Sequence, residues 1–250
     1  PATLEILTRD GREWNSELLL DPDAAVFHKA ILWEEGILSI SGGIPNSDQR
    51  AHLKYWTRTG ETWTARTLWT SDWDSSKHRL RDFEIGDVDG DGQSEIVLAT
   101  HDQGYVVVLD EAFSPDSIRA TRLDFRDNTY VHEIELGDVD GDGRPEIFAT
   151  PSDPNRSGET QPGTVVMYRY ENGEYNRTLL DHTERTHAKE ILAADLDGDG
   201  VAELFSAVEA IKEGGTVLSQ VEIRQFLFEN GEPMGHRVVA TIDDQQLRFM

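Results

Sequence analysis

The feature that most constrains this chain is a nine-residue acidic motif that occurs three times. The copies begin at Asp87, Asp138 and Asp195, which lie 51 and then 57 residues apart. Each copy has carboxylates at positions 1, 3, 5 and 9 and glycines at positions 4 and 6. Similarity at such a period is typical of repeat architectures. The chain is therefore expected to fold as a series of similar units, three of which carry an acidic loop.

The motif predicts a cation site, because carboxylates at alternate positions of a tight loop direct several oxygens toward one point. Ca²⁺ fits best, since it takes about six to eight oxygen ligands from carboxylates, carbonyls and water. Without an ion, the twelve carboxylates of three acidic turns would repel one another. We predict three calcium ions. Their ligands, including the carbonyl of position 7, would be Asp87, Asp89, Asp91, Gln93 and Glu95; Asp138, Asp140, Asp142, Arg144 and Glu146; and Asp195, Asp197, Asp199, Val201 and Glu203.

The start of the motif also matches an EF-hand loop, which needs a bidentate Glu at position 12 and a helix on each side. Position 12 is instead Leu98, Ala149 or Ser206. Short apolar runs such as residues 96–99 flank the motif, and runs of this kind bounded by Gly and Asp indicate strands. The loop is therefore expected to join two β-strands.

A second marker repeats with a similar period. Hairpin turns are expected at Asp10-Gly11, Thr59-Gly60, Asn172-Gly173 and Asn230-Gly231, where Gly-containing turns separate apolar runs. Both markers predict an all-β fold, a β-propeller with four-stranded antiparallel blades.

The expected organisation is one propeller domain over residues 1–250, with blades at approximately 28–74, 78–127, 131–182 and 187–242. Residues 1–25 and 245–250 would be parts of a further or closing blade. This leaves two alternatives: a closed five-bladed ring with one strand missing, or part of a larger, for example seven-bladed, ring. An open ring would offer unpaired blade edges for association.

Residues 85–96, IGDVDGDGQSEI, and their copies at 136–147 and 193–204 resemble the FG-GAP or VCBS repeats of calcium-binding β-propellers, a type also found in integrin α-subunit heads. The resemblance implies that the ions lie on one rim, in the loops between the first and second strands of the blades. It does not imply one function, because such proteins include adhesion heads, lectins, polysaccharide lyases and sugar dehydratases.

The net charge limits the classes of partner that we expect, and the calcium motif limits the cellular compartment. The 23 basic and 48 acidic residues give a formal net charge of −25, which disfavours nucleic acid and anionic membrane surfaces. No apolar run approaches the ~20 residues of a membrane helix, so no membrane insertion is expected. Weak calcium sites are filled where calcium is abundant, at about 10⁻⁴–10⁻³ M. We therefore expect an extracellular, cell-surface or periplasmic protein.

Histidines are the candidate ligand residues on the opposite face. His28, His78, His132 and His187 lie at the entry to the first strand of each blade, and His101 lies in a short loop on the same face. They would form either a transition-metal site or an acid/base centre. The alternative is that they are only polar rim residues. His78 precedes its acidic loop by an odd number of residues and His132 and His187 by an even number, so their side chains would not all point the same way from their strands.

Two functions remain open. The first is a non-catalytic module that binds a protein or glycan partner, for example in cell adhesion. The second is a metal-assisted polysaccharide lyase or sugar dehydratase with a His-lined channel mouth. The chain has no nucleophile motif, phosphate loop or Cys/His zinc pair, which favours the first.

Overall fold

The computed structural model describes residues 1–43, 48–60, 62–72, 79–101, 103–113, 117–124, 126, 129–154 and 157–243. Over these ranges the chain forms strands and turns, and the prediction of an all-β fold is confirmed. No helix with the length and apolar character of a membrane span occurs in this described part. The four-stranded antiparallel sheets are propeller-like blades, and no sheet closes on itself into a barrel.

The chain divides into two compact units, Pro1–Asp82 and Phe83–Met250. The first unit contains one two-stranded hairpin and one four-stranded antiparallel sheet. Its strands are β1 (Ala2–Asp10) and β2 (Glu13–Asp21) in the hairpin, and β3 (Val26–Trp33), β4 (Gly36–Gly42), β5 (His52–Thr59) and β6 (Thr62–Thr70) in the sheet.

The core of the first unit joins its hairpin to its sheet. Leu19 of β2 is buried with Ile37 of β4 and Trp56 of β5. Beside them, the Lys54 ammonium group lies 2.7 Å from the Asp21 carboxylate, and both side chains are almost completely buried. A buried charge is tolerated only when it is paired, so this ion pair fixes the end of the hairpin against β5.

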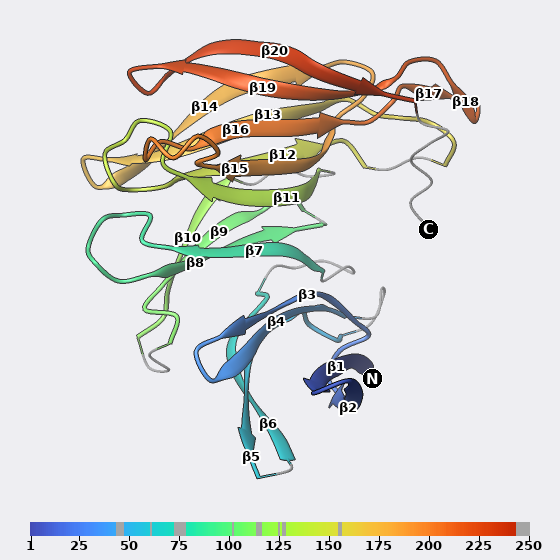
Figure 1. Cartoon of the computed structure of the whole chain (residues 1–250), viewed down its shortest axis with the longest axis vertical. Coiled ribbons are helices and arrows are strands. Elements are labelled where there is room, and N and C mark those ends of the chain that lie inside the picture. Colours follow the sequence, from blue (N-terminus) through green and yellow to red (C-terminus); the bar gives the residue numbers. More distant parts are fainter. Residues whose placement is uncertain are drawn as a thin grey trace. The chain divides into compact units, whose positions relative to one another are not determined.

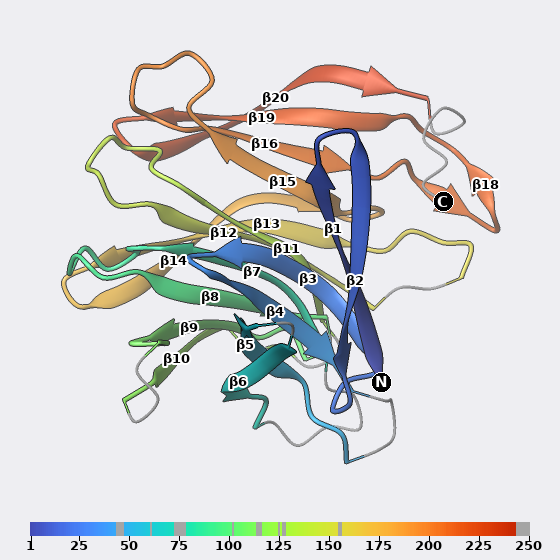
Figure 2. The same ribbon diagram turned by 60° about the horizontal axis from the view of Figure 1, so that its bottom comes forward.

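The second unit contains three four-stranded sheets, each an antiparallel meander in chain order. Figures 1 and 2 both show these sheets as successive layers. The unit boundary falls inside β7, whose sheet belongs to the second unit. The strands are β7 (Leu80–Gly86), β8 (Glu95–Thr100), β9 (Val106–Asp110) and β10 (Arg119–Asp124); β11 (Tyr130–Gly137), β12 (Glu146–Ser152), β13 (Gly163–Glu171) and β14 (Glu174–Thr183); and β15 (Ala188–Ala194), β16 (Glu203–Val208), β19 (Val221–Glu229) and β20 (Glu232–Ile242).

The middle strands are apolar on both faces, which explains why the sheets stack. Every residue of β8 and of β12 is buried, as expected for strands covered on both sides. One core cluster joins the first and second sheets through residues such as Val97, Ile134 and Tyr168. Another joins the second and third sheets through residues such as Phe148 and Leu204. We call these two contacts the first and second junctions.

The predicted four-stranded antiparallel sheets are present in the described residues. The blade bounds 28–74, 78–127, 131–182 and 187–242 stay predictions. The expected turns are present, and Gly11, Gly60, Gly173 and Gly231 have the positive φ that such turns require. Between β16 and β19, a short hairpin forms from β17 (Lys212–Glu213) and β18 (Thr216–Val217). Residues 245–250 lie outside the described residues, so the closing blade and the total number of blades stay predictions.

Candidate cation-binding loops

The three acidic loops occupy equivalent positions in the second unit. They connect β7 to β8, β11 to β12 and β15 to β16, the first and second strands of each sheet. The sheet of the first unit instead joins β3 to β4 through a tight turn in which Glu34 has a φ of 50°. The prediction that the motif joins two strands agrees with this topology.

The motif shapes its own loop through its first carboxylate. In the first loop, Asp87 accepts hydrogen bonds from the N–H groups of Gly90 at 2.8 Å and Gly92 at 2.9 Å. Asp138 and Asp195 accept the corresponding bonds in the other two loops. Gly90 and Gly92 have φ of 77° and 88°, a region that glycine enters without steric cost.

The curled loops bring carboxylate oxygens together. The groups of side chains whose ligand atoms lie within 4.8 Å of one another are Asp87, Asp89, Asp91 and Glu95 in the first loop; Asp138, Asp140 and Glu146 in the second; and Asp195, Asp197 and Asp199 in the third. Like charges at such distances favour protonation or a bound cation. The pKa of Asp89 is raised, chiefly by burial, and burial raises the pKa of Glu95 to about 7.

Glu95 gives the best test of whether a cation fits. Its side chain is buried, and Oε2 accepts a hydrogen bond from the Val88 N–H at 2.8 Å. Oε1 is also buried and has no hydrogen-bond partner among the described residues. An unsatisfied buried carboxylate oxygen is costly, and a cation held by the loop would satisfy it. The all-oxygen donor set suits a hard cation such as calcium.

The second loop has the same motif, but two arginines contact its carboxylates: Arg144 of the loop itself and Arg169 of β13. Arg169 Nε lies 2.8 Å from Glu146 Oε1 and 3.4 Å from Asp140 Oδ2. Arg144 Nε donates to Asp142 Oδ2 at 3.1 Å. Burial acts to raise the pKa of Asp142, but the hydrogen bonds from Arg144 outweigh it and lower the pKa. Part of the negative charge that would bind a cation is therefore already offset within the chain.

The third loop is the most exposed. Asp195, Asp197 and Asp199 are all exposed, and Glu203 is not part of their close group. Glu203 still accepts the N–H of Leu196 through Oε2 at 2.9 Å, the same bond that Glu95 makes in the first loop. The backbone plan is thus shared, while the packing around the carboxylates is not.

The residue across from the position 9 glutamate differs in each sheet. Ile96 pairs with Leu109, Ile147 with Tyr168 and Phe205 with Gln225. Continuing each register toward the acidic loop places Asp110 opposite Glu95, Arg169 opposite Glu146 and Leu227 opposite Glu203. Directly opposite residues on paired strands share a face of the sheet. Our sequence reasoning missed this position, although an Asp and an Arg at the same step of the third strand were a detectable signal.

The position 7 residues were predicted to supply carbonyl ligands. The N–H groups of Gln93, Arg144 and Val201 each donate to the position 5 carboxylate of their own loop at 2.8 Å. Their side chains approach the preceding loop: Arg144 lies close to Gly90, and Val201 lies close to Gly141. This approach leaves little room for a side chain at Gly90 and Gly141, whereas nothing lies within 4 Å at Gly198, where the positive φ of 81° accounts for the glycine. Ligation by the three carbonyls stays a prediction.

Three of the predicted histidines gather at the ends of the sheets opposite the acidic loops. The rings of His132 and His187 are stacked, with centroids 4.7 Å apart, and the His101 ring lies 6.0 Å from that of His132. His132 and His187 are buried. Burial lowers the pKa of His187 to about 3. His28 lies on β3 of the first unit, and His78 lies outside the described residues.

Comparison with protein families gives two overlapping matches, at residues 87–149 and 138–206, to a model described as an FG-GAP-like repeat. Residues 87–206 are FG-GAP-like repeats. Each match begins at an acidic loop and ends just after the next one, so the first match contains β8 to β11 and the second contains β12 to β15. The matched repeats have the period of the sheets but are offset from them by one strand. No curated protein matches the chain. FG-GAP repeats often bind calcium and are typical of extracellular proteins, and the acidic groups of the three loops are of the type that could hold a metal ion.

Proposed function

We propose that this chain is an extracellular calcium-binding β-propeller module that offers its surface to a protein or glycan partner. The observation that carries the proposal is the first loop, where four carboxylates converge around the buried Glu95 oxygen that has no hydrogen-bond partner among the described residues. Calcium tolerates a flexible, all-oxygen shell, whereas Mg²⁺ demands near-ideal octahedral geometry and retains its water. The first loop therefore favours calcium.

The acidic loops are placed to stabilise the blades rather than to perform chemistry. Each loop spans the first and second strands of its sheet, so an ion held there would tie both strand ends together. A site that binds only the folded chain adds about 2.7 kcal/mol when calcium is at a hundredfold excess over Kd. The fully loaded protein should be considerably more stable than the calcium-free protein.

A thermal melt with and without a calcium chelator tests this proposal. Adding excess chelator should lower the midpoint by many degrees, and restoring calcium should return it. Magnesium at the same concentration is the matched control and should restore much less. An unchanged midpoint after chelation, together with metal analysis that finds no calcium in the native protein, would contradict the proposal.

The grouping of His101, His132 and His187 bears on the alternative of a metal-assisted lyase or dehydratase. His132 and His187 are 2% and 1% exposed, and their rings face each other in a stack. His132 Nε2 lies 2.9 Å from Ser152 Oγ, and His187 Nδ1 lies 3.3 Å from the Gln161 carbonyl oxygen. Rings that are buried and engaged in this way present little surface to a sugar substrate. Stoichiometric Zn, Mn, Fe or Cu after calcium removal would revive the enzyme alternative.

A further inference from the structure

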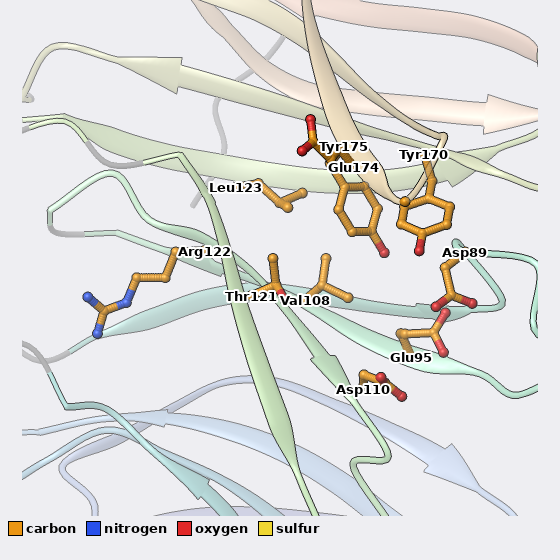
Figure 3. A pocket seen from close by; sticks show the side chains of 11 residues that line it. Asp89, Glu95, Val108, Asp110, Thr121, Arg122, Leu123, Tyr170, Glu174 and Tyr175 are labelled. Carbon is orange, nitrogen blue, oxygen red and sulfur yellow. The ribbon is translucent and has the colours of Figure 1, made fainter.

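A pocket lies at the first junction, beside the first acidic loop. It has a volume of about 430 Å³ and is formed by β8, β9 and β10 of the first sheet together with the tip of the β13–β14 hairpin. Figure 3 shows its side chains, with the hydroxyl ends of Tyr170 and Tyr175 directed toward Asp89 and Glu95. Asp110 lies near the same carboxylates (Figure 3). We call this space the junction pocket.

Two buried carboxylate oxygens in the junction pocket have no hydrogen-bond partner among the described residues. They are Glu95 Oε1 and Asp110 Oδ1. Glu95 is 1% exposed, and a calcium ion in the loop would satisfy its oxygen. Asp110 lies outside the acidic motif, and its other oxygen already accepts a hydrogen bond from Arg119 Nη2 at 2.6 Å. Asp110 Oδ1 therefore still lacks a partner when the loop holds its ion.

At the second junction, the position equivalent to the junction pocket is occupied by a side chain of the chain itself. There, Arg169 takes the place of Asp110, and its guanidinium group reaches Glu146 at 2.8 Å and Asp140 at 3.4 Å. The same group donates through Nη2 to the carbonyl of Gly231, at the tip of the β19–β20 hairpin, at 2.8 Å. The chain thus fills the second junction with its own guanidinium group.

Each contact of Arg169 has a counterpart around the junction pocket. Glu95 corresponds to Glu146, Asp89 to Asp140, and the tip glycine Gly173 to Gly231, and all three of these counterparts line the pocket. What differs is the residue at the end of β9, which is an acid instead of an arginine. The first junction therefore keeps the acceptors of a guanidinium site and adds one more carboxylate, while the chain supplies no guanidinium group at the corresponding position.

Charge and aromatic surface favour the same ligand. The first loop and Asp110 together carry five carboxylates, so one Ca²⁺ and the Arg119 guanidinium leave a net negative charge. The rings of Tyr170 and Tyr175 lie 4.9 Å apart on the pocket wall. Organic cations bind well against aromatic faces, and a guanidinium group forms paired hydrogen bonds with carboxylates. An anionic ligand would be repelled by these carboxylates, and a neutral donor would leave their charge without a counterion.

We propose that the junction pocket binds the guanidinium group of an arginine side chain presented by a protein partner. The proposal rests on the proposed function of the chain as a calcium-loaded binding module, and it names the partner's chemistry. With Asp89 and Glu95 holding the calcium ion, Asp110 Oδ1 would accept from the guanidinium group, and the carbonyl of Gly173 would take the place that Gly231 has beside Arg169. The tyrosine rings, which contact each other, would pack against one side of it.

The test uses the calcium-saturated full chain and two short capped peptides, one with arginine and one with the neutral isostere citrulline. NMR titration should show saturable shifts of pocket resonances with the arginine peptide and at least tenfold weaker binding of the citrulline peptide. Calcium stoichiometry is measured first on the same sample, so a failure of calcium binding is recognised separately. Equal binding of the two peptides, or binding of neither, would overturn the proposal.

Variants that exchange the two junctions sharpen the test. Asp110→Arg should fill the pocket from within, as Arg169 does in the second junction, and abolish binding of the arginine peptide. Leu227→Arg adds the same charge at the matched step of the third sheet and should leave peptide binding unchanged. Arg169→Asp should create a second site and raise the peptide stoichiometry from one to two. A pocket that instead takes up an extra calcium ion, lost in the Asp110→Arg variant, would show that metal rather than arginine is its ligand.

Discussion

The two junctions of the second unit are built from the same repeat, but the residues beside the position 9 glutamate have opposite charges. In the first junction Asp110 stands beside Glu95, whose Oε1 has no hydrogen-bond partner among the described residues. In the second junction Arg169 stands beside Glu146 and pairs with it. The apolar packing is similar in kind, since a cluster of buried side chains joins the sheets at each junction.

This difference shows that the motif determines the backbone conformation of an acidic loop but not the net charge around its carboxylates. The hydrogen bonds from Gly90 and Gly92 to Asp87 recur in the other loops, because they depend only on residues inside the motif. The charge that a loop presents depends also on the third strand of its sheet. A single residue there decides whether the chain itself places a cationic group beside the acidic loop.

Removal of Arg169 should have the largest effect. Arg169→Leu places at this position the residue type that the third sheet has, and it leaves the buried Glu146 carboxylate without its partner. Breaking a buried pair in this way costs about 3 kcal/mol of the free energy of unfolding. Urea denaturation in the presence of chelator should show this loss. Saturating calcium should reduce the loss, because the ion then offsets the charge of Glu146.

Arg119→Leu is the matched control, since it removes an arginine from an exposed ion pair with Asp110 in the first junction. Exposed pairs contribute about 0–1 kcal/mol, so its effect should be small. A loss as large as that of Arg169→Leu would mean that the two junctions do not differ in the way described. A negligible effect of Arg169→Leu in chelator would do the same.

The second largest effect that we expect is a pH dependence of the free energy of unfolding, caused by His187 at the second junction. His187 has a folded pKa of about 3, lowered mainly by burial and then by Lys189, against about 6.5 in the unfolded chain. Above pH 6.5 both states are neutral at this residue. As pH falls from 6.5 toward 3, only the unfolded chain takes up a proton, so stability is lost at about 1.4 kcal/mol per pH unit. At pH 5 the expected loss is about 2 kcal/mol.

Calcium-free protein must be used for this measurement, because acid also releases bound cations. Urea denaturation of His187→Gln should remove most of the pH slope between 6.5 and 5. His182→Gln, at an exposed histidine, is the control for the His-to-Gln exchange itself and should change the free energy of unfolding at pH 7 only slightly. Equal slopes in the His187→Gln variant and the parent chain would contradict the assignment.

Much of this architecture could be predicted from the sequence, and the reasons are local. The acidic motif and the turns at Gly173 and Gly231 encode their conformations within a few residues, so the strand plan followed from their spacing. The stacking of His132 on His187 and the pairing of Arg169 with Glu146 join residues of different strands or sheets. Such contacts depend on strand register and sheet packing, which periodicity alone does not determine.

The last prediction concerns the order of calcium affinities in the three loops. The first loop gathers four carboxylates without a cation among them, whereas in the second loop Arg144 and Arg169 already pair with Asp142 and Glu146. An ion that enters the second loop must compete with these pairs, which should weaken its affinity by at least tenfold, or about 1.4 kcal/mol.

Calorimetric titration of single-site variants measures this order. Asp89→Asn, in the first loop, should abolish the tightest binding phase. Asp140→Asn, at the same position of the second loop, should remove a weaker phase and leave the tightest one intact. Since both changes replace one carboxylate at position 3 by an amide, any difference between them reflects the surroundings of the loops. The opposite order would show that the arginines do not hinder the ion, and that Asp110 rather than Arg169 is the unfavourable neighbour.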